Sequence, residues 1–306
     1  MYRVSLGVPV YNGESFLCAS LESILRQTFD DFELVISDNA STDATQEICR
    51  TYSALDNRIR YFRNNSNYGV VWNHNRVLEL STGKYFKWCG ADDLILPTYI
   101  SRCVDALEMN PSATLCYTNA IAIDQNGVPI EKDPAHQHVL QRLLSSPDVI
   151  TRFSNLLRPL HREVTPFHGV IRLAALRSIP PHRNFLAADR CLLAELSILG
   201  PFICIPEQLF YRRSNLRYNN EANRHEISLY KPGEPSRFMF REWRVAFESF
   251  CAIRRAVVSP HIHRKLLFAW LCWILRTRET LKEEIKGLIK HYIKQYWYNV
   301  KTGVNA

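Results

Sequence analysis

Residues 4–45 read VSLGVPVYNGESFLCASLESILRQTFDDFELVISDNASTDAT and contain two strand patterns on either side of one helix pattern. The apolar stretch 4–8 is followed by a proline, which has no N–H to donate within a sheet. Residues 14–27 place apolar side chains at helical spacing, and residues 32–37 form a second apolar stretch that ends at Asp38. A strand, a helix and a second strand in this order predict a parallel βαβ unit.

The same alternation continues along the chain, with further helices expected at 43–55, 70–81 and 97–110 and further strands at 59–63, 84–89 and 113–123. Short links between these segments predict an α/β fold with a mostly parallel, Rossmann-like sheet flanked by helices. Residues 124–188 lack such a period and look irregular, apart from a turn at 124–127. A helix over 189–200 and a strand over 202–206 follow.

Composition indicates a folded cytoplasmic protein. Hydrophobic residues make up 46% of the 306 residues and charged residues 22%, which is ordinary for a globular chain. The nine cysteines are scattered without CxxC spacing, so we expect reduced thiols and neither a disulfide framework nor a zinc site. The start of the sequence has no signal-peptide pattern, and the longest apolar run, 266–275, is too short to span a bilayer.

The net charge of +8 is concentrated at the C-terminal end. Residues 237–306 hold 14 Lys and Arg against 5 Asp and Glu, whereas the first 236 residues hold 24 against 25. A global basic field for nucleic acid is therefore not expected.

Polar residues follow three of the expected strands. Pro9, Tyr11 and Glu14 follow the first, Asp38 ends the second, and the segment KWCGADDLILP (87–97) brings an acidic pair to the end of the fourth. Ligands of open α/β sheets bind beyond the carboxyl ends of the strands, so these residues are candidates for one site. Taken singly, each segment also reads as an ordinary polar turn.

The acidic pair, Asp92 and Asp93, has two interpretations. Carboxylates are ligands that Mg²⁺ or Mn²⁺ accepts together with substrate phosphates, and such an ion neutralises the charge of a departing diphosphate. Acids also stabilise helix N-termini, and a helix is expected to begin near Pro97. The residues alone leave both interpretations open.

Taken together, these segments resemble the family 2 glycosyltransferases, which have the GT-A fold. The resemblance rests on the opening 4–45 and on NYGVVWNHNRVLELSTGKYFKWCGADDLILP (67–97), is close over residues 3–123 and continues more loosely to about 213. It implies transfer of a sugar from a nucleotide-diphosphate sugar of the UDP, dTDP or GDP type. The expected acceptor is a hydroxyl of a glycan or lipid-linked glycan in polysaccharide or cell-envelope synthesis.

The resemblance also assigns roles to particular positions. Those expected to bind the nucleotide sugar are Pro9, Tyr11, Glu14, Asp38, Asn75 and Asp93, with Asp38 accepting from the base. Asp92 would hold the divalent cation, Mn²⁺ or Mg²⁺. The chain departs from the family at Gly90 and Ala91, where many relatives carry an acid, and at His74, where relatives often have Arg.

Inverting members use an aspartate as general base, and AADRCLLAELSILGPFICIPEQLFYRR (187–213) matches that segment, with Asp189 as the base and Ala188 in place of the usual Glu. A carboxylate within hydrogen-bond reach removes the proton of an acceptor hydroxyl as the new C–O bond forms. Asp189 is also a candidate N-cap of the helix that follows. His168 and Arg212 are placed on the acceptor side, although an ordinary loop and a surface role fit them equally well.

The resemblance divides the chain into a catalytic domain at 1–215, a linker at 216–236 and a basic, aromatic helical extension at 237–306. The nucleotide-sugar half of the catalytic domain is 1–123, and the acceptor half is 124–215. The extension fits either a peripheral helix on the inner face of the membrane or a helical cap packed on the domain.

Two rival functions remain at this point. A nucleotidyltransferase shares the α/β sheet and an acidic metal site, but the loop PVYNGES (9–15) after the first strand carries no Lys or Arg for phosphates. A catalytically silent, membrane-associated binding module is compatible with Gly90, Ala91 and Ala188.

Overall fold

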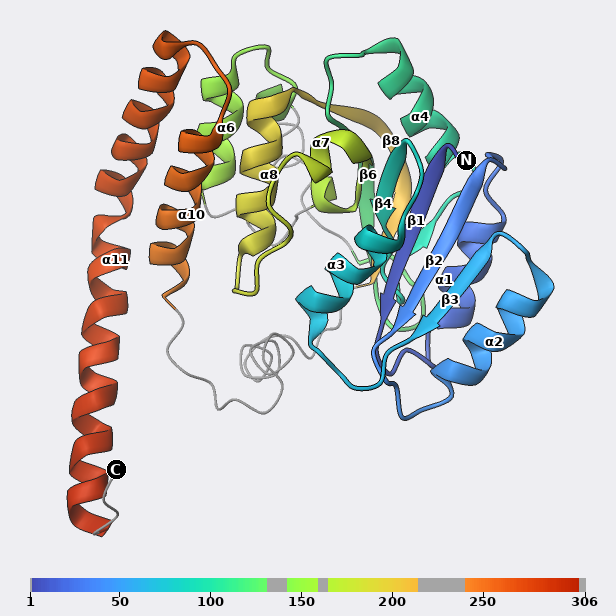
Figure 1. The fold of residues 1–306 in the computed structure, drawn as a ribbon, viewed down its shortest axis with the longest axis horizontal. Coiled ribbons are helices and arrows are strands. Elements are labelled where there is room, and N and C mark those ends of the chain that lie inside the picture. The colour runs from blue at the N-terminus through green and yellow to red at the C-terminus, as the bar shows by residue number, and fades with distance from the viewer. Residues whose placement is uncertain (1, 131–141, 159–164, 214–239, 303–306) are drawn as a thin grey trace.

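The protein was analysed as a computed structural model, which describes residues 2–130, 142–158, 165–213 and 240–302. Its centre is an eight-stranded sheet in the order β3-β2-β1-β4-β7-β6-β8-β5 (Figure 1). The strands are β1 Val4–Val10, β2 Phe32–Asp38, β3 Ile59–Arg63, β4 Tyr85–Trp88, β5 Leu94–Ile95, β6 Leu115–Ile123, β7 Val170–Arg172 and β8 Phe202–Arg213.

Helices cover both faces of this sheet. They are α1 Leu17–Leu25, α2 Thr45–Leu55, α3 Val70–Leu80, α4 Tyr99–Met109, α6 Val149–Leu157, α7 Leu173–Arg177, α8 Ala188–Leu199, α10 Arg241–Arg255 and α11 Pro260–Thr302, with a short 3₁₀ turn η1 at Thr165–His168. One core cluster joins the sheet to α1, α2 and α4, and the other joins it to α3, α6, α8, α10 and α11. The α/β prediction is therefore confirmed.

Alternating side chains of β1 and β2 explain the two layers. In β2, Leu34 and Ile36 belong to the core cluster of α1, and Val35 between them belongs to that of α3. Gly7 of β1 faces α3, where an added Cβ would lie 2.9 Å from Cγ2 of Val77. Because only a glycine leaves this space, α3 packs directly against the first strand.

The second half of the sheet mixes directions: β6 and β8 are parallel, as a mostly parallel sheet predicts, whereas β7 departs from that pattern. The pairs of β1 with β2, β1 with β4 and β2 with β3 are parallel, but β7 pairs antiparallel with both β4 and β6. The region expected to be irregular, 124–188, also contains α6, η1 and α7. The expected turn at 124–127 is present, since the Asp124 carboxylate accepts from the amides of Asn126 and Val128. A three-residue strand is too short for its period to be recognised in the sequence.

The C-terminal extension packs on the rest of the described chain over most of its length. Helices α10 and α11 are antiparallel neighbours that lie against α8 and α6 (Figure 1), and Leu266, Trp273 and Leu281 of α11 are buried. The last turns of α11 extend beyond α10. Of the two interpretations of this extension, packing is confirmed for 241–284. The expected linker at 216–236 lies outside the described residues. No helix within those residues is both long and apolar enough to cross a bilayer.

Candidate functional site

The carboxyl ends of β2, β1 and β4 bring the first candidate residues to one edge of the sheet. β1 pairs with β2 up to Val10 opposite Asp38, and on its other side with β4 up to Gly7 opposite Trp88. The loops that carry Tyr11 and the acidic pair leave from this edge. The expectation that these residues share one edge is confirmed by the strand pairing.

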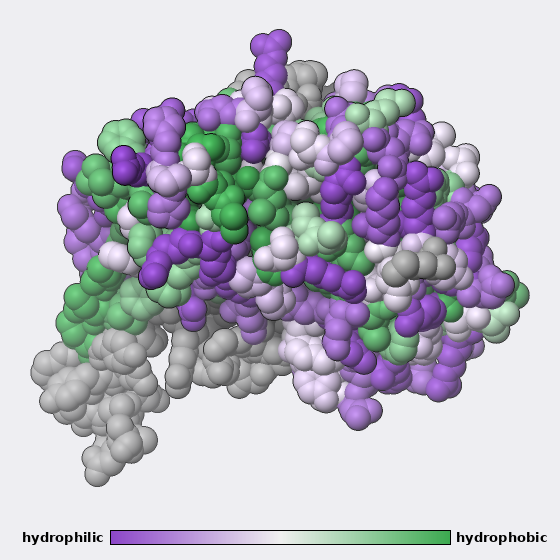
Figure 2. Space-filling model, turned by 45° about the horizontal axis from the view of Figure 1, so that its top comes forward, coloured by the Kyte–Doolittle hydropathy of each residue, from purple (hydrophilic) through white to green (hydrophobic). Residues whose placement is uncertain are grey.

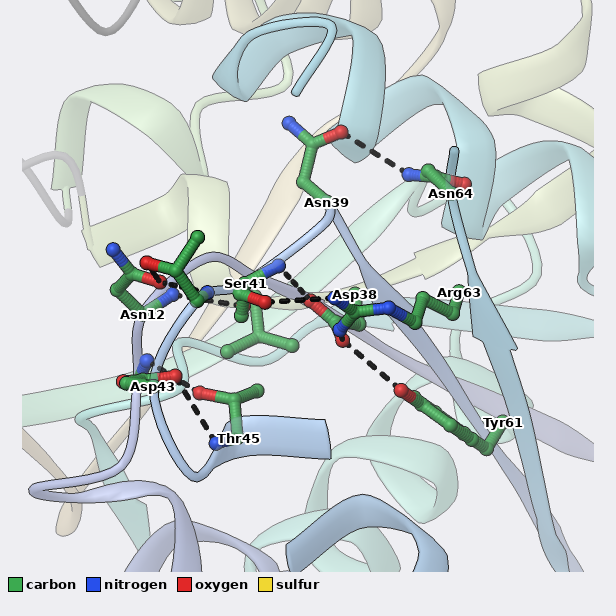
Figure 3. A network of polar contacts seen from close by, with 12 residues as sticks. Asn12, Asp38, Asn39, Ser41, Asp43, Thr45, Tyr61, Arg63 and Asn64 are labelled. Atoms are coloured by element: carbon green, nitrogen blue, oxygen red, sulfur yellow. Dashed lines mark hydrogen bonds and ion pairs between the residues drawn. The ribbon is translucent and has the colours of Figure 1, made fainter. Parts of the chain in front are cut away.

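The carboxylate of Asp38 is fully buried and already holds three partners (Figure 3). Its Oδ1 accepts from the amide of Ser41 at 2.8 Å, and its Oδ2 accepts from the hydroxyl of Tyr61 at 3.0 Å and from Nη1 of Arg63 at 2.5 Å. Arg63 also donates to the carbonyl of Ser41 at 2.8 Å. The sequence reading missed Tyr61 and Arg63, although both stand at alternate positions at the end of β3, where they share the face of Asp38.

The loop after β1 is tied to the loop after β2. The backbone amide of Asn12 donates to Oγ of Ser41 at 2.9 Å, and the side-chain oxygen Oδ1 of Asn12 accepts from the backbone amide of Thr42 at 2.8 Å. The carboxylate of Glu14 accepts from the amide of Ala44 at 2.9 Å. Asn12 has a φ of 51°, a left-handed conformation that asparagine tolerates better than most residues. These bonds join the loops at 11–14 and 41–44 into a rigid rim of the candidate site, so that the loops lose less conformational freedom when a ligand binds.

Two candidates on this rim differ in exposure. Tyr11 keeps 41% of its surface exposed, so its ring is available to a ligand. Pro9 lies within β1 opposite Ser37 and is partly buried. The roles assigned to Pro9, Tyr11, Glu14 and Asp38 in binding the nucleotide sugar remain predictions.

Asp92 and Asp93 both fold back over Gly90. A Cβ added at Gly90 would lie 2.5 Å from Oδ2 of Asp93 and 3.1 Å from Oδ1 of Asp92. The amide of Arg213 donates to the other oxygen of Asp93 at 2.9 Å, and Nε of Arg213 donates to the Asp92 carbonyl at 3.0 Å. The missing family acid at Gly90 thus leaves the space that the two carboxylates occupy.

Both carboxyls of the pair hold a proton more tightly than an exposed aspartate does. Burial, together with the neighbouring Asp92 charge, raises the pKa of Asp93 to about 7. Burial also raises the pKa of Asp92. A pair of desolvated carboxylates favours either a shared proton or a bound cation.

The oxygen-only donors at this site fit a hard divalent cation. Asp92 is the ligand expected from the resemblance, and both carboxylates point into the same small space over Gly90. Within the described residues no group of three or more His, Cys, Asp or Glu side chains is placed to hold a metal. A protein site of one or two carboxylates is what Mg²⁺ typically uses when substrate phosphates supply other ligands.

Asp189 lies in the first turn of α8, and the helix begins at Ala188 after Ala187, whose φ is 71°. Burial raises the pKa of the Asp189 carboxyl. Its Oδ1 accepts from the amide of Arg190 at 2.8 Å. No side chain caps α8 by a hydrogen bond at its N-cap, so the alternative role of Asp189 as the N-cap is not what the structure has.

Arg212 lies among the three acids. Its positive charge lowers the pKa of Asp92, Asp93 and Asp189 alike. One positive side chain at the end of β8, Arg212, thus acts both on Asp189 and on the acidic pair, about a hundred positions earlier in the sequence. This convergence is the central feature of the candidate site.

His168 lies beneath the acidic loop. Its carbonyl accepts from the ammonium of Lys87 and, at 3.0 Å, from the hydroxyl of Tyr99. Lys87 is fully buried between the rings of Tyr99 and Phe210, 4.7 and 5.0 Å from their centroids. Burial lowers the pKa of the His168 imidazole well below its usual range. The sequence reading missed Lys87, which here connects β4 to η1.

Asn75 holds the chain that leads to Asp189. Its amide donates to the carbonyl of His182 at 2.8 Å and accepts from the amide of His182 at 2.9 Å. The contact of Asn75 with a nucleotide sugar stays a prediction. Its two hydrogen bonds to His182, in the loop before α8, are a feature that the sequence did not indicate.

Comparison with known proteins agrees with this geometry. Residues 5–171 match glycosyl transferase family 2. The chain belongs to this family.

Relatives with a curated description match about two fifths of the chain. A putative glycosyltransferase of Bacillus subtilis, EpsE, is 34% identical over 127 residues, or 41% of this chain and 46% of its own length. The chondroitin synthase of Escherichia coli is 32% identical over 124 residues, or 40% of this chain and 18% of its own length. The chain thus spans less than half the length of these relatives.

Solved structures share the fold over most of the chain. TarS of S. aureus in complex with UDP-GlcNAc aligns with a TM-score of 0.62 at 17% identity, covering 90% of this chain and 73% of that protein. The mannosyltransferase PcManGT from Pyrobaculum calidifontis, in complex with GDP-Man and Mn²⁺, aligns with a TM-score of 0.56 at 18% identity, covering 97% and 88%. The helical C-terminal part is included in this similarity.

Proposed function

We propose that this chain is an inverting, metal-dependent glycosyltransferase that moves a sugar from a nucleotide-diphosphate sugar to a hydroxyl acceptor. The observation that carries the proposal is the convergence of Asp189 with Asp92 and Asp93 around Arg212 at the carboxyl edge of the sheet. One acid is thus available for proton transfer, and a separate acidic pair for the diphosphate end of the donor.

In this mechanism Asp189 is the general base. Its carboxylate takes the acceptor hydroxyl proton while the acceptor oxygen forms a bond to the anomeric carbon. The bond from that carbon to the diphosphate oxygen breaks on the opposite face, and the nucleoside diphosphate leaves with the electron pair, so the configuration inverts. Burial raises the pKa of Asp189, which brings it closer to the working pH and makes it a stronger base.

The acidic pair and Arg212 serve the leaving group. Asp92, with Asp93 beside it, would hold the cation, which neutralises charge on the leaving diphosphate when it is bound. Arg212 adds a fixed positive charge at the same edge of the sheet. Tyr11 would stack on the base, and Asp38, which Arg63 and Tyr61 hold in place, would accept a hydrogen bond from the base.

The donor class is supported by the neighbours in fold. TarS and PcManGT were solved with UDP-GlcNAc and with GDP-Man respectively. We accordingly place the donor among UDP-, dTDP- and GDP-sugars, and the acceptor among glycans and lipid-linked glycans of cytoplasmic polysaccharide synthesis.

A membrane surface is the proposed second partner, through the exposed face of α11. Ile285, Ile289 and Ile293 stand at helical spacing and are 39%, 52% and 52% exposed. Residues 285–302 contain four lysines and no acidic residue. Figure 2 shows hydrophobic side chains interleaved with hydrophilic ones along the side of the molecule that leads to this helix end. Apolar and basic groups together suit the anionic inner face of a membrane, whereas like charges disfavour a second copy of the same helix.

Hydrolysis of a panel of UDP-, dTDP- and GDP-sugars with Mn²⁺ or Mg²⁺ tests the enzyme proposal, with Asp92→Ala and Asp189→Ala beside the unchanged chain. We expect both substitutions to lower the rate at least a hundred-fold. Full turnover in both variants would refute the assignment. Release of pyrophosphate from a nucleoside triphosphate and a sugar phosphate would instead support the nucleotidyltransferase, and binding without turnover would support the silent module.

Co-sedimentation with vesicles of anionic or neutral lipid tests the membrane partner. The full chain should pellet with anionic vesicles at low salt, and a variant with Ile285, Ile289 and Ile293 all changed to Ser should remain in the supernatant. Equal pelleting of the two proteins contradicts this role of α11.

A further inference from the structure

A buried ion pair joins the C-terminal extension to the helix of the candidate base. Arg190 of α8 and Glu242 of α10 are 5% and 1% exposed, and Nη2 of Arg190 lies 2.7 Å from Oε2 of Glu242. The other oxygen of Glu242 accepts from Nε of Arg241 at 3.0 Å. Both oxygens of Glu242 therefore have a cationic partner, and the position of the Arg190 side chain is fixed from outside its own helix.

Helix α11 in turn fixes the end of α10 that carries Glu242. The carboxylate of Glu284 accepts from the amides of Glu242 at 3.0 Å and of Trp243 at 3.3 Å, which satisfies two donors at the N-terminus of α10. The indole of Trp243 donates to the carbonyl of Leu281 at 3.0 Å. The extension thus reaches α8 through a series of direct contacts.

Arg190 is adjacent to Asp189 in sequence and acts on it in two ways. Its amide donates to Oδ1 of Asp189 at 2.8 Å, and its positive charge favours the ionised form of that carboxyl. Adjacent side chains on a helix point in different directions, so Arg190 would have to leave its present rotamer to pair with Asp189; without Glu242 it would lose the anion that holds it there. A direct pair would weaken Asp189 as a base, because the carboxylate would be stabilised before it accepts a proton.

We propose that Glu242 is a positioning residue of the transferase, holding Arg190 away from Asp189 and so keeping the base free for the acceptor hydroxyl. The proposal rests on the proposed function, since it takes Asp189 as the base. It makes the C-terminal extension part of the catalytic apparatus in addition to its packing role. Burying an ion pair contributes little net stability, so packing alone does not require Arg190 and Glu242.

A second ion cluster between the same helices provides a matched control. Glu248 of α10 accepts from Nε of Arg183 at 2.9 Å, and Glu195 of α8 accepts from Arg255 at 2.9 and 3.0 Å. Glu248 is buried like Glu242 and lies on the same helix, but its partner Arg183 is not among the groups with the largest effects on the pKa of Asp189.

The charged groups around Asp189 among the described residues include Asp92 and Asp93 of the same proposed site, Arg183 before α8 and Glu195 on α8 itself. Arg190 on its own helix and Arg212 on β8 act on it directly. The elements packed against α8 contribute these further titratable or charged groups: Arg152 of α6, which donates to the carbonyl of Ser197 towards the far end of α8, Arg177 of α7, His168 of η1, and Glu242 and Glu248 of α10. If the pH profile shifts after a change of Glu242 or Arg190, these named groups are the other titratable or charged side chains whose contribution has to be considered.

The test measures kcat and kcat/KM against pH for the full chain, with Mn²⁺, water as acceptor and the nucleotide sugar of the panel that it hydrolyses fastest. We expect Glu242→Gln to lower kcat about ten-fold or more and to move the acid limb of kcat/KM to lower pH, because Arg190 then pairs with the base. Arg190→Met should move that limb to higher pH by about one unit, and Arg190→Lys should leave it nearly in place. Glu248→Gln should change neither the limb nor kcat.

A double variant shows whether Glu242 acts through Arg190. If it does, Arg190→Met with Glu242→Gln loses no more kcat than Arg190→Met alone, whereas independent effects would multiply. An unmoved acid limb in both Glu242→Gln and Arg190→Met overturns the proposal, as does a fully multiplicative double variant. If Glu242→Gln does not fold, the acid limbs of Arg190→Met and Arg190→Lys decide the question, because only the first is expected to shift. Failure of the proposed function is distinguishable, since Asp189→Asn would then hydrolyse the donor as fast as the unchanged chain.

Discussion

Replacing Gly90 with alanine adds one methyl group at the point where the two acidic side chains meet. The new Cβ would lie 2.5 Å from Oδ2 and 3.0 Å from Cγ of Asp93, and ordinary contacts begin at 3.4 Å. Gly90 is not among the glycines with a positive φ, so the backbone itself accepts alanine there. The substitution therefore tests only the space that the carboxylates occupy.

The magnitude follows from the bonds that must change. The Asp93 carboxylate has to move by about 1 Å, which breaks its 2.9 Å bond from the amide of Arg213. Leaving that partly buried donor unpaired costs about 1–3 kcal/mol, and overpacking costs a similar amount when the neighbour cannot move. We expect Gly90→Ala to lower the free energy of unfolding by about 1–3 kcal/mol, or roughly 2–4 °C in Tm for each kcal/mol.

The assay combines thermal unfolding with donor hydrolysis. Because displaced carboxylates would hold the cation poorly, we expect kcat/KM to fall about ten-fold or more in Gly90→Ala. Asp93→Ala supplies the control, since it removes the side chain that the new methyl group meets. In that background Gly90→Ala should have almost no further effect on Tm.

An unchanged Tm and rate in Gly90→Ala would refute the reasoning, and so would an equal loss of Tm with and without the Asp93 side chain. The same geometry predicts that Gly90→Asp, which restores the acid of many relatives, damages the site instead of completing it.

Three further predictions concern pH and the C-terminal extension. Burial raises the pKa of Asp93 to about 7, so the ionisation of this carboxyl destabilises the cation-free fold as pH rises from about 4 through 7. Asp93→Asn should therefore raise Tm at pH 8 and leave Tm unchanged at pH 4. An equal change of Tm at both pH values would contradict this. Burial lowers the pKa of His182 to about 3, so as pH falls below 6.5 the unfolded chain takes up a proton on this histidine before the folded chain does, and the free energy of unfolding falls by up to about 1.4 kcal/mol per pH unit. In His182→Phe, the free energy of unfolding measured with urea should depend less on pH between 4 and 6.5. An unaltered slope would show that His182 does not cause this pH dependence. Trp273 of α11 is 5% exposed and Ile289 is 52% exposed. Trp273→Ala should therefore lower the free energy of unfolding by about 3–5 kcal/mol, and Ile289→Ala should lower it by less than about 0.5 kcal/mol. Similar unfolding midpoints for the two variants would argue against the packing of the extension.

The local pattern of the first half was predictable because each element has its own period. β1 and β2 are apolar stretches and α1 carries apolar residues at helical spacing, each long enough to be recognised, and the loops after the strands contain turn residues and acids. The common edge of Tyr11, Asp38 and Asp92 follows from parallel pairing, which βαβ order favours. The metal and nucleotide roles came from the resemblance and stay predictions until the assays above are made.

The second half was less predictable because its elements are short and paired over long distances. β7 has only three residues and pairs with strands about 55 and 85 positions away, so neither its existence nor its antiparallel direction leaves a local pattern. The packing of α10 and α11 on the domain could not be predicted either, because an amphipathic helix has the same sequence pattern whether its apolar face packs on protein or binds to lipid.

By itself the sequence determined the βαβ half, the acids at its strand ends and the candidate base at the start of α8, because each depends on neighbours within a few residues. Only the tertiary structure decided how these groups are held. The partners of Asp38 come from β3, those of the acidic pair from β8, and that of Arg190 from a helix about fifty residues further on. Buried charges need partners wherever the fold can supply them, and contacts between distant segments leave no period in a single sequence.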